Sequence, residues 1–187
     1  MNPLVLCTQA FDFAARRHVH QRRKGKDAEP YLNHLAEVAC LLAEATGGHD
    51  PTVVIAGILH DTIEDTGTTH AELVRLFGTD VAELVKEVTD DKTLPKATRK
   101  RLQIENAAHK SERARMIKIA DKVSNLRALA LSPPADWSHE RRVAYFDWAH
   151  AVVAGCRGIN HSLERAFDAA YADGVRALAT GAEGAGS

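Results

Sequence analysis

The stretch Asp50-Pro51-Thr52-Val53-Val54-Ile55-Ala56-Gly57-Ile58-Leu59-His60-Asp61 decides how this chain folds. An aspartate followed by proline is typical of a helix start, because the aspartate caps free N–H groups and proline at the first helical position needs no N–H partner. The apolar run that follows predicts a helix over residues 53–63 that is buried at the centre of the protein. The pair His60-Asp61 therefore lies near the end of that helix, where water is excluded.

Apolar residues recur at three- and four-residue spacing along almost the whole chain, which is typical of amphipathic helices. The helices that this spacing predicts cover residues 6–21, 35–42, 53–63, 69–77, 80–88, 95–109, 113–131, 138–153 and 159–178. No alternating strand pattern is present in the sequence. We therefore expect an all-α, compact multi-helix domain over residues 1–178. The glycine-rich end, residues 179–187, has little to pack, and we expect a disordered tail there.

Length and charge limit the classes of function. A chain of 187 residues with 45% hydrophobic and 26% charged residues suits one globular domain with a real core. The net charge of −1 provides no overall attraction for nucleic acid, so we expect no nucleic-acid partner. A phosphorylated ligand would need a local basic patch, and the basic segments 21–26 and 92–101 are the candidates. Taken alone, each of these segments could equally be a solvated surface.

The cysteines and the N-terminus indicate a cytoplasmic protein. Cys7, Cys40 and Cys156 are odd in number and share no CxxC spacing, so we expect free thiols in a reducing compartment. The N-terminus has no basic flank before its short apolar run, which disfavours a signal peptide. No stretch approaches about 20 uninterrupted apolar residues, so we expect no membrane span. The sequence does not specify whether the chain forms a homo-oligomer.

Four side chains form a candidate ligand set for one divalent transition metal: His34, His60, Asp61 and Asp121. Two imidazoles and two carboxylates suit Mn, Fe, Co or Zn better than Ca or Mg. Each of these residues alone is more often an ordinary core or surface residue, and their joint occurrence carries the hypothesis. Adjacent helical positions diverge by about 100°, so residues 60 and 61 reach one ion only where the helix bends or meets the ion end-on.

Two further acids, Glu64 and Asp65, follow the His-Asp pair by one helical turn. A carboxylate pair is poor core material unless it is paired or lies beside a metal. Such a pair next to a metal indicates activated water, and activated water indicates hydrolysis.

At this point the sequence resembles a known family in several local strings. They are Arg22-Arg23-Lys24, Tyr31-Leu32-Asn33-His34, His60-Asp61-Thr62-Ile63-Glu64-Asp65-Thr66 and Lys118-Ile119-Ala120-Asp121-Lys122 with Asn125-Leu126. These strings resemble the HD-domain phosphohydrolases and, within them, the hydrolase half of the RelA/SpoT family. Segments 88–101 and 145–149 are similar to its stand-alone members, the metazoan SpoT homologues and bacterial small alarmone hydrolases. The resemblance covers roughly residues 5 to 170 in one register.

The resemblance implies a Mn²⁺-dependent hydrolase that removes the 3′-pyrophosphate of the alarmone (p)ppGpp, giving GDP or GTP and lowering the stringent-response signal. It implies metal binding by His34, His60, Asp61 and Asp121, and water orientation and deprotonation by Glu64 and Asp65. It further implies substrate contacts by Arg23 and Lys24 beside the nucleotide, Asn125 beside the sugar, and Lys96, Arg141 and Tyr145 at phosphates or ribose.

Two departures from the family pattern affect substrate preference more than activity. Leu35 stands where a proline often follows the first histidine, and Ala128 stands where a threonine is common. Two other functions stay open. One is another nucleotide phosphohydrolase on the same metal site, such as an NADPH 2′-phosphatase, which would release orthophosphate. The other is a non-catalytic alarmone sensor, against which Glu64 and Asp65 weigh, since a sensor has no use for a water-activating pair.

Overall fold

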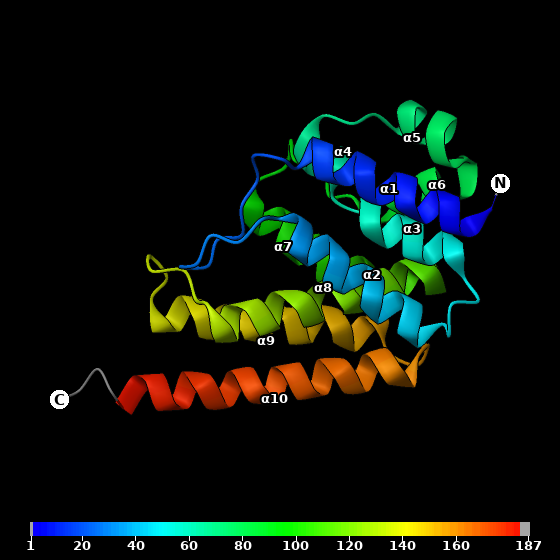
Figure 1. The fold of residues 1–187 in the computed structure, drawn as a ribbon. Coiled ribbons are helices and arrows are strands. Elements are labelled where there is room, and N and C mark those ends of the chain that lie inside the picture. Colours follow the sequence, from blue (N-terminus) through cyan, green and yellow to red (C-terminus); the bar gives the residue numbers. More distant parts are fainter. Residues whose placement is uncertain (1, 184–187) are drawn as a thin grey trace.

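A computed structural model describes residues 2–183 and folds them into helices joined by short loops (Figure 1). The helices are α1 (Pro3–Arg17), α2 (Leu32–Ala45), α3 (Pro51–Leu59), α4 (Thr62–Thr66), α5 (His70–Phe77), α6 (Thr79–Val88), α7 (Lys96–Asn106), the 3₁₀ helix η1 (Ala107–His109), α8 (Glu112–Leu131), α9 (His139–Cys156) and α10 (His161–Glu183). Within residues 2–183 there is no strand, only an isolated β-bridge between Arg22 and Pro30. The all-α prediction is confirmed.

Helix α3 is the centre of the fold, as its apolar sequence predicts. The Asp50 side chain accepts a hydrogen bond from Val53 N at 3.2 Å, and every residue from Val53 to Leu59 is buried. The helix packs against α1, α2, α6 and α8. A Cβ atom on Gly57 would lie 2.3 Å from Leu42 Cδ1, so glycine at this position lets α2 approach α3 closely.

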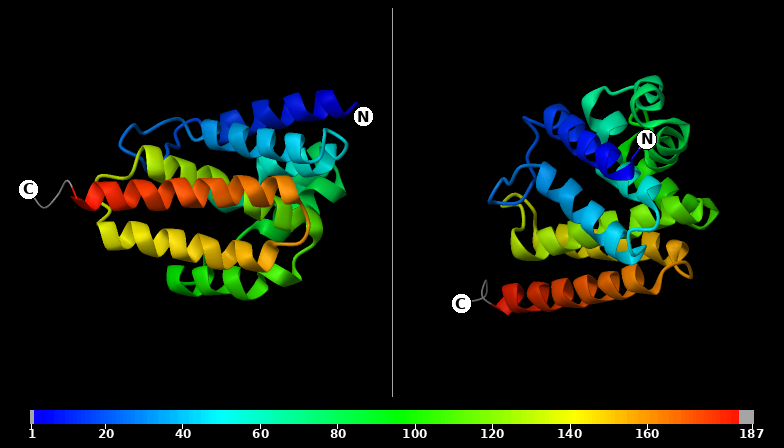
Figure 2. Two further views of the ribbon diagram at one scale, coloured as in Figure 1. Left: turned by 90° about the horizontal axis from the view of Figure 1, so that it is seen from below. Right: turned by 45° about the vertical axis from the view of Figure 1, so that its right-hand side comes forward.

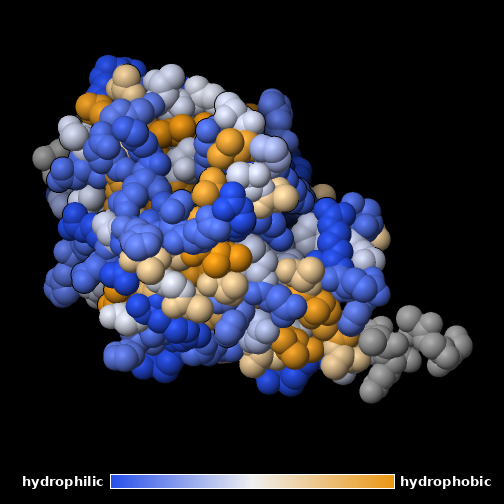
Figure 3. All heavy atoms as spheres, turned by 180° about the vertical axis from the view of Figure 1, so that it is seen from behind, coloured by the Kyte–Doolittle hydropathy of each residue, from blue (hydrophilic) through white to orange (hydrophobic). Residues whose placement is uncertain are grey.

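Helices α8, α9 and α10 build the second part of the molecule. The long α10 lies along α8 and α9 at the lower edge of Figure 1, and Figure 2 shows the same neighbours from below. Phe146 of α9 and Phe167 of α10 are both buried where these helices meet. On the face seen in Figure 3, hydrophobic residues form small groups among hydrophilic ones. No helix in the described range is both long and apolar enough to cross a bilayer.

Several predicted boundaries were wrong. Helix α1 ends at Arg17 rather than near residue 21, because the chain turns at His18. Helix α7 ends at Asn106 and continues only as the short η1. Helix α10 runs to Glu183, so residues 179–183 are helical rather than part of a disordered tail. Alanine, the best helix former, precedes the glycines of this region and carries the helix onward. The rest of the expected tail, residues 184–187, lies outside the described residues.

Candidate metal centre and active site

The centre forms where the buried helix ends. Helix α3 stops at Leu59 and α4 begins at Thr62, so His60 and Asp61 lie between the two helices rather than within one. The prediction of one continuous helix over residues 53–63 was therefore wrong, and the break gives the side chains of residues 60 and 61 directions that adjacent positions of one helix would not have. His60 Nε2 and Asp61 Oδ2 lie 2.9 Å apart.

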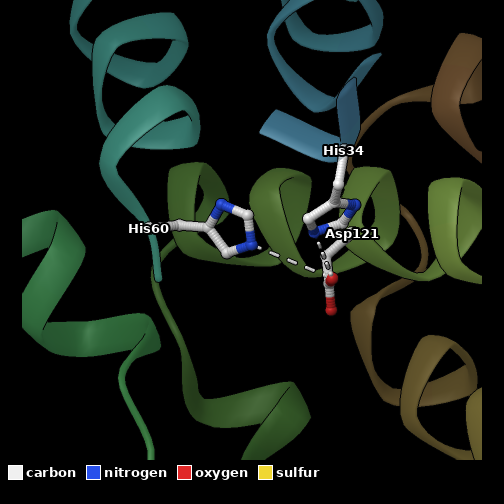
Figure 4. Close-up of side chains that lie close together, drawn as sticks. All are labelled: His34, His60 and Asp121. Atoms are coloured by element: carbon white, nitrogen blue, oxygen red, sulfur yellow. Dashed lines mark ion pairs between the residues drawn. The ribbon is translucent and has the colours of Figure 1, made fainter. Parts of the chain in front are cut away.

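His34 in the first turn of α2 and Asp121 in the middle of α8 complete the group (Figure 4). His34 Nε2 lies 3.3 Å from Asp121 Oδ1 and 3.7 Å from Asp61 Oδ2. His60 Nε2 lies 3.8 Å from the same oxygen of Asp121. The ligand atoms of His34, His60 and Asp121 all lie within 4.8 Å of one another. Helices α2 and α8 and the α3–α4 junction thus bring all four candidate ligands together.

Both histidines turn Nε2 toward this point because Nδ1 is engaged elsewhere. His60 Nδ1 lies 2.7 Å from Gly57 O, a carbonyl that can only accept, so Nδ1 carries the proton. His34 Nδ1 lies 2.9 Å from Ser124 Oγ, whose own proton goes to Glu37 Oε2 at 2.7 Å. In their neutral form both rings therefore offer a lone pair at Nε2.

The two Nε2 atoms fit a divalent ion. Each is buried and lacks a hydrogen-bond partner, a state that costs roughly 1–3 kcal/mol per polar group if nothing else occupies the space between the ligands. Burial lowers the pKa of His60, but the carboxylates of Asp61 and Asp121 outweigh burial and raise that pKa to about 10. The two carboxylates thus favour a positive charge at this point, which a divalent ion would supply.

The two carboxylates are held by neighbouring donors. Tyr31 donates its hydroxyl to Asp61 Oδ2 at 2.5 Å. Asn125 Nδ2 donates to Asp121 Oδ1 at 2.6 Å, and the buried Lys122 Nζ donates to Asp121 Oδ2 at 2.7 Å. Such partners fix the direction of metal-ligating oxygens, so the centre is organised before any ion binds.

Glu64 and Asp65 extend from α4 toward the same space. Asp90 N donates to Glu64 Oε2 at 3.2 Å, and Arg99 Nη1 lies 3.5 Å from Glu64 Oε1. Gln21 Nε2 donates to Asp65 Oδ2 at 2.8 Å, and Lys92 pairs with the other oxygen, Oδ1. Burial and the nearby Asp61 carboxylate raise the pKa of Glu64. A carboxylate with a raised pKa is better suited to accept a proton near neutral pH.

A cavity of about 790 Å³ opens above these acids. The residues that the sequence assigned to the substrate all line it: Arg23, Lys24, Lys96, Asn125, Arg141 and Tyr145. Glu64, Asp65 and the metal-ligand candidates except His60 line it as well. Arg23 Nη2 lies 3.3 Å from Asn125 Oδ1, while its Nη1 is buried without a partner. One cavity therefore joins the basic segments to the acidic centre.

The sequence reasoning missed several residues of this cavity. Tyr31 stands in a string that we singled out, yet its bond to Asp61 had no role in the prediction. Trp148 has ammonium groups of Lys100 and Lys122 at 4.4 and 4.5 Å from its ring centroid. No spacing in the sequence indicates this cluster, since its members come from three different helices.

The two departures from the family pattern have clear positions. Leu35 is fully buried in the core, and α2 begins at Leu32, ahead of His34. A leucine at position 35 thus leaves the helix start in place before the first metal-ligand candidate. Ala128 lines the cavity, so the missing hydroxyl concerns the ligand rather than the fold.

Comparison with known proteins relates the chain to one family over most of its length. The model of the HD domain matches residues 10–146. Guanosine-3′,5′-bis(diphosphate) 3′-pyrophosphohydrolase MESH1 of Xenopus tropicalis is 49% identical over 169 residues, covering 90% of this chain and 94% of that protein. The Homo sapiens protein of the same name is 51% identical over 159 residues, covering 85% and 89%. The solved structure of a metazoan ortholog of SpoT that hydrolyzes ppGpp matches with a TM-score of 0.86 and 46% identity, covering 89% and 94%.

Proposed function

The chain belongs to the HD-domain family, and on that premise we propose that it hydrolyses the 3′-pyrophosphate of (p)ppGpp, releasing pyrophosphate and GDP or GTP. The observation that carries the proposal is the group of His34, His60 and Asp121, joined by the nearby Asp61, beside a cavity with basic residues in its lining. Relatives about half identical to this chain along most of their length are named for this reaction. This enzymatic activity lowers the stringent-response signal.

The charges of the cavity suit such a substrate. An alarmone carries phosphates on both sides of its ribose, and the chain as a whole has a net charge of only −1. Nine cations nevertheless line the cavity: Arg22, Arg23, Lys24, Lys92, Lys96, Arg99, Lys100, Arg127 and Arg141. Hydrogen bonds from such groups to phosphate oxygens are short and strong because both partners are charged.

His34, His60, Asp61 and Asp121 would hold the ion. Two imidazoles and two carboxylates suit Mn, Fe, Co or Zn, and we propose Mn²⁺ because the resemblance to the RelA/SpoT hydrolases implies it. The bound ion supplies Lewis acidity, which favours ionisation of water and offsets charge on the phosphate. In this arrangement Glu64 takes the proton of the attacking water, helped by its raised pKa. Asp65 orients that water from the next position of α4.

The other side chains bind the nucleotide. Arg23, fixed to α8 through Asn125, and Lys24 flank it from the loop before α2. Asn125 itself lies beside the sugar. Lys96, Arg141 and Tyr145 contact phosphate or ribose from α7 and α9. These six residues form the cationic rim of the cavity, and we propose that they supply the binding energy. The bond-breaking chemistry belongs to the acidic centre, which consists of the metal-ligand candidates with Glu64 and Asp65.

One assay tests the function directly. Purified protein with Mn²⁺ and ppGpp should release pyrophosphate, and chelation of the metal should stop the release. NADPH, assayed in parallel for orthophosphate, tests the alternative phosphatase. Binding of ppGpp without turnover under any metal would contradict hydrolysis and favour the sensor. Orthophosphate from NADPH with no pyrophosphate from ppGpp would favour the phosphatase.

A further inference from the structure

Three histidines are buried in the described part of the chain, and two of them, His34 and His60, belong to the proposed metal centre. The third, His18, follows the last residue of α1 and is 3% exposed. The reaction described above gives it no role. Its Nε2 atom is buried without a hydrogen-bond partner, which is destabilising. Because Nε2 contributes no hydrogen bond, the reason for an imidazole at this position must lie in the contacts of Nδ1 and of the ring face.

One contact leads to the acid pair through Gln21. His18 Nδ1 lies 2.6 Å from Gln21 Oε1, and Gln21 Nε2 lies 2.8 Å from Asp65 Oδ2. A carboxylate only accepts, so Gln21 must turn its NH₂ group to Asp65 and its carbonyl oxygen to His18. That oxygen carries no proton, and His18 Nδ1 must therefore be the donor. Each of the three side chains in this series of hydrogen bonds, His18, Gln21 and Asp65, therefore has one orientation.

A second contact leads to the metal centre through Tyr31. The rings of His18 and Tyr31 stack with centroids 5.2 Å apart and planes 27° from parallel. Tyr31 in turn donates its hydroxyl to Asp61 Oδ2. One buried imidazole thus supports two carboxylates of the site from behind, one by a hydrogen-bond chain and one by packing.

We propose that His18 is a positioning residue that acts through Gln21 to fix which oxygen of Asp65 faces the attacking water. This role rests on the proposed hydrolysis. Gln21 holds Oδ2, and Oδ1 pairs with Lys92, whose side chain is 48% exposed. When Lys92 turns to a substrate phosphate, Oδ1 is released while Oδ2 stays held. Asp65 then presents one free oxygen in a fixed direction.

A double-mutant cycle tests the proposal. His18→Phe keeps an aromatic ring against Tyr31 and removes only the hydrogen bond to Gln21. We expect kcat for pyrophosphate release to fall about tenfold with KM and Mn²⁺ content unchanged. In an Asp65→Ala background, the same change should alter kcat by less than about twofold, because the hydrogen bonds from His18 through Gln21 no longer reach a carboxylate. His20→Phe, on an exposed neighbour, is the matched control and should behave as wild type.

A second variant, Gln21→Met, tests the same hydrogen bonds in case His18→Phe fails to fold, because Gln21 is only partly buried and its replacement disturbs the core less. It should reproduce the loss in kcat and the dependence on Asp65. An equal loss with and without Asp65 would show a general packing effect and overturn the proposal. Unchanged kcat in both folded variants would overturn it as well. A wild-type protein that releases no pyrophosphate would overturn the hydrolytic function itself, and is recognised before the variants are compared.

Discussion

The two ends of the cavity are built in opposite ways. At the metal end His34 and His60 are 1% and 6% exposed, and their Nδ1 atoms are fixed by Ser124 and Gly57. At the cationic rim Arg141 is 45% exposed, and its pairing with Asp136 spans 3.7 Å. The metal end is therefore organised during folding, whereas exposed rim side chains such as Arg141 become ordered only when an anion binds. Substitutions at the metal end should abolish chemistry, and substitutions at the rim should weaken capture.

The largest expected effect is at the metal end. His60→Ala or Asp61→Ala removes a proposed metal ligand, so bound Mn²⁺ and pyrophosphate release should both be lost while the helical fold largely survives. Metal analysis and circular dichroism on the same samples measure this. His49→Ala, at an exposed histidine, is the control and should keep both metal and activity. Full stoichiometric metal in both variants would contradict the assignment of these residues as metal ligands.

The acid pair should give the next largest effect. Glu64→Gln or Asp65→Asn preserves shape and removes basicity, and a positioned general base contributes about 10²–10⁴-fold in rate. We expect kcat to fall at least about 100-fold while metal content and ppGpp binding stay near wild type. Steady-state rates combined with calorimetry on the same proteins separate turnover from binding. If both amide variants turned over ppGpp at near wild-type rates, the acids would only support the centre.

A feature of this molecule could be predicted from the sequence where neighbouring residues produce it, and could not where distant residues do. The burial of α3 follows from a local pattern, an apolar run of seven residues, whereas the break after Leu59 was not predicted from that run. The bonds of Ser124 to His34 and of Gln21 to Asp65 join residues 90 and 44 positions apart, so no local pattern reveals them. The extension of α10 to Glu183 was missed because the segment has little to pack against, although alanine-rich sequence sustains a helix. The residue types at the centre could thus be predicted from the sequence, but the contacts that support them could not.

A third prediction removes one such supporting contact. Ser124→Ala deletes the partner of His34 Nδ1 and leaves Glu37 without the serine proton. The His34 ring then loses its fixed tautomer, and partners of this kind are worth about 10–100-fold in metal affinity or activity. We expect weaker Mn²⁺ binding in a metal titration, with activity regained at high Mn²⁺. Wild-type metal affinity in this variant would mean that packing alone orients His34.

The smallest effects belong to the rim, and two adjacent cations there can be compared. Arg23 is partly buried, contacts Ser124 O and Asn125 Oδ1, and keeps Nη1 buried without a partner at the cavity. Lys24 lines the same cavity but is exposed. A desolvated cation that already has a fixed direction loses less entropy on binding phosphate than an exposed one does.

Arg23→Ala should therefore raise KM about tenfold, near the lower bound for a hydrogen bond to a charged group. Lys24→Ala should raise KM only about two- to fivefold, the range of an exposed ion pair, and high salt should shrink that difference first. Both variants should keep kcat, because contacts made equally in the ground and transition states affect only binding. Initial rates across ppGpp concentrations at two ionic strengths measure this. A large fall in kcat at saturating ppGpp with KM unchanged would place Arg23 in the chemistry and remove the division between rim and metal end.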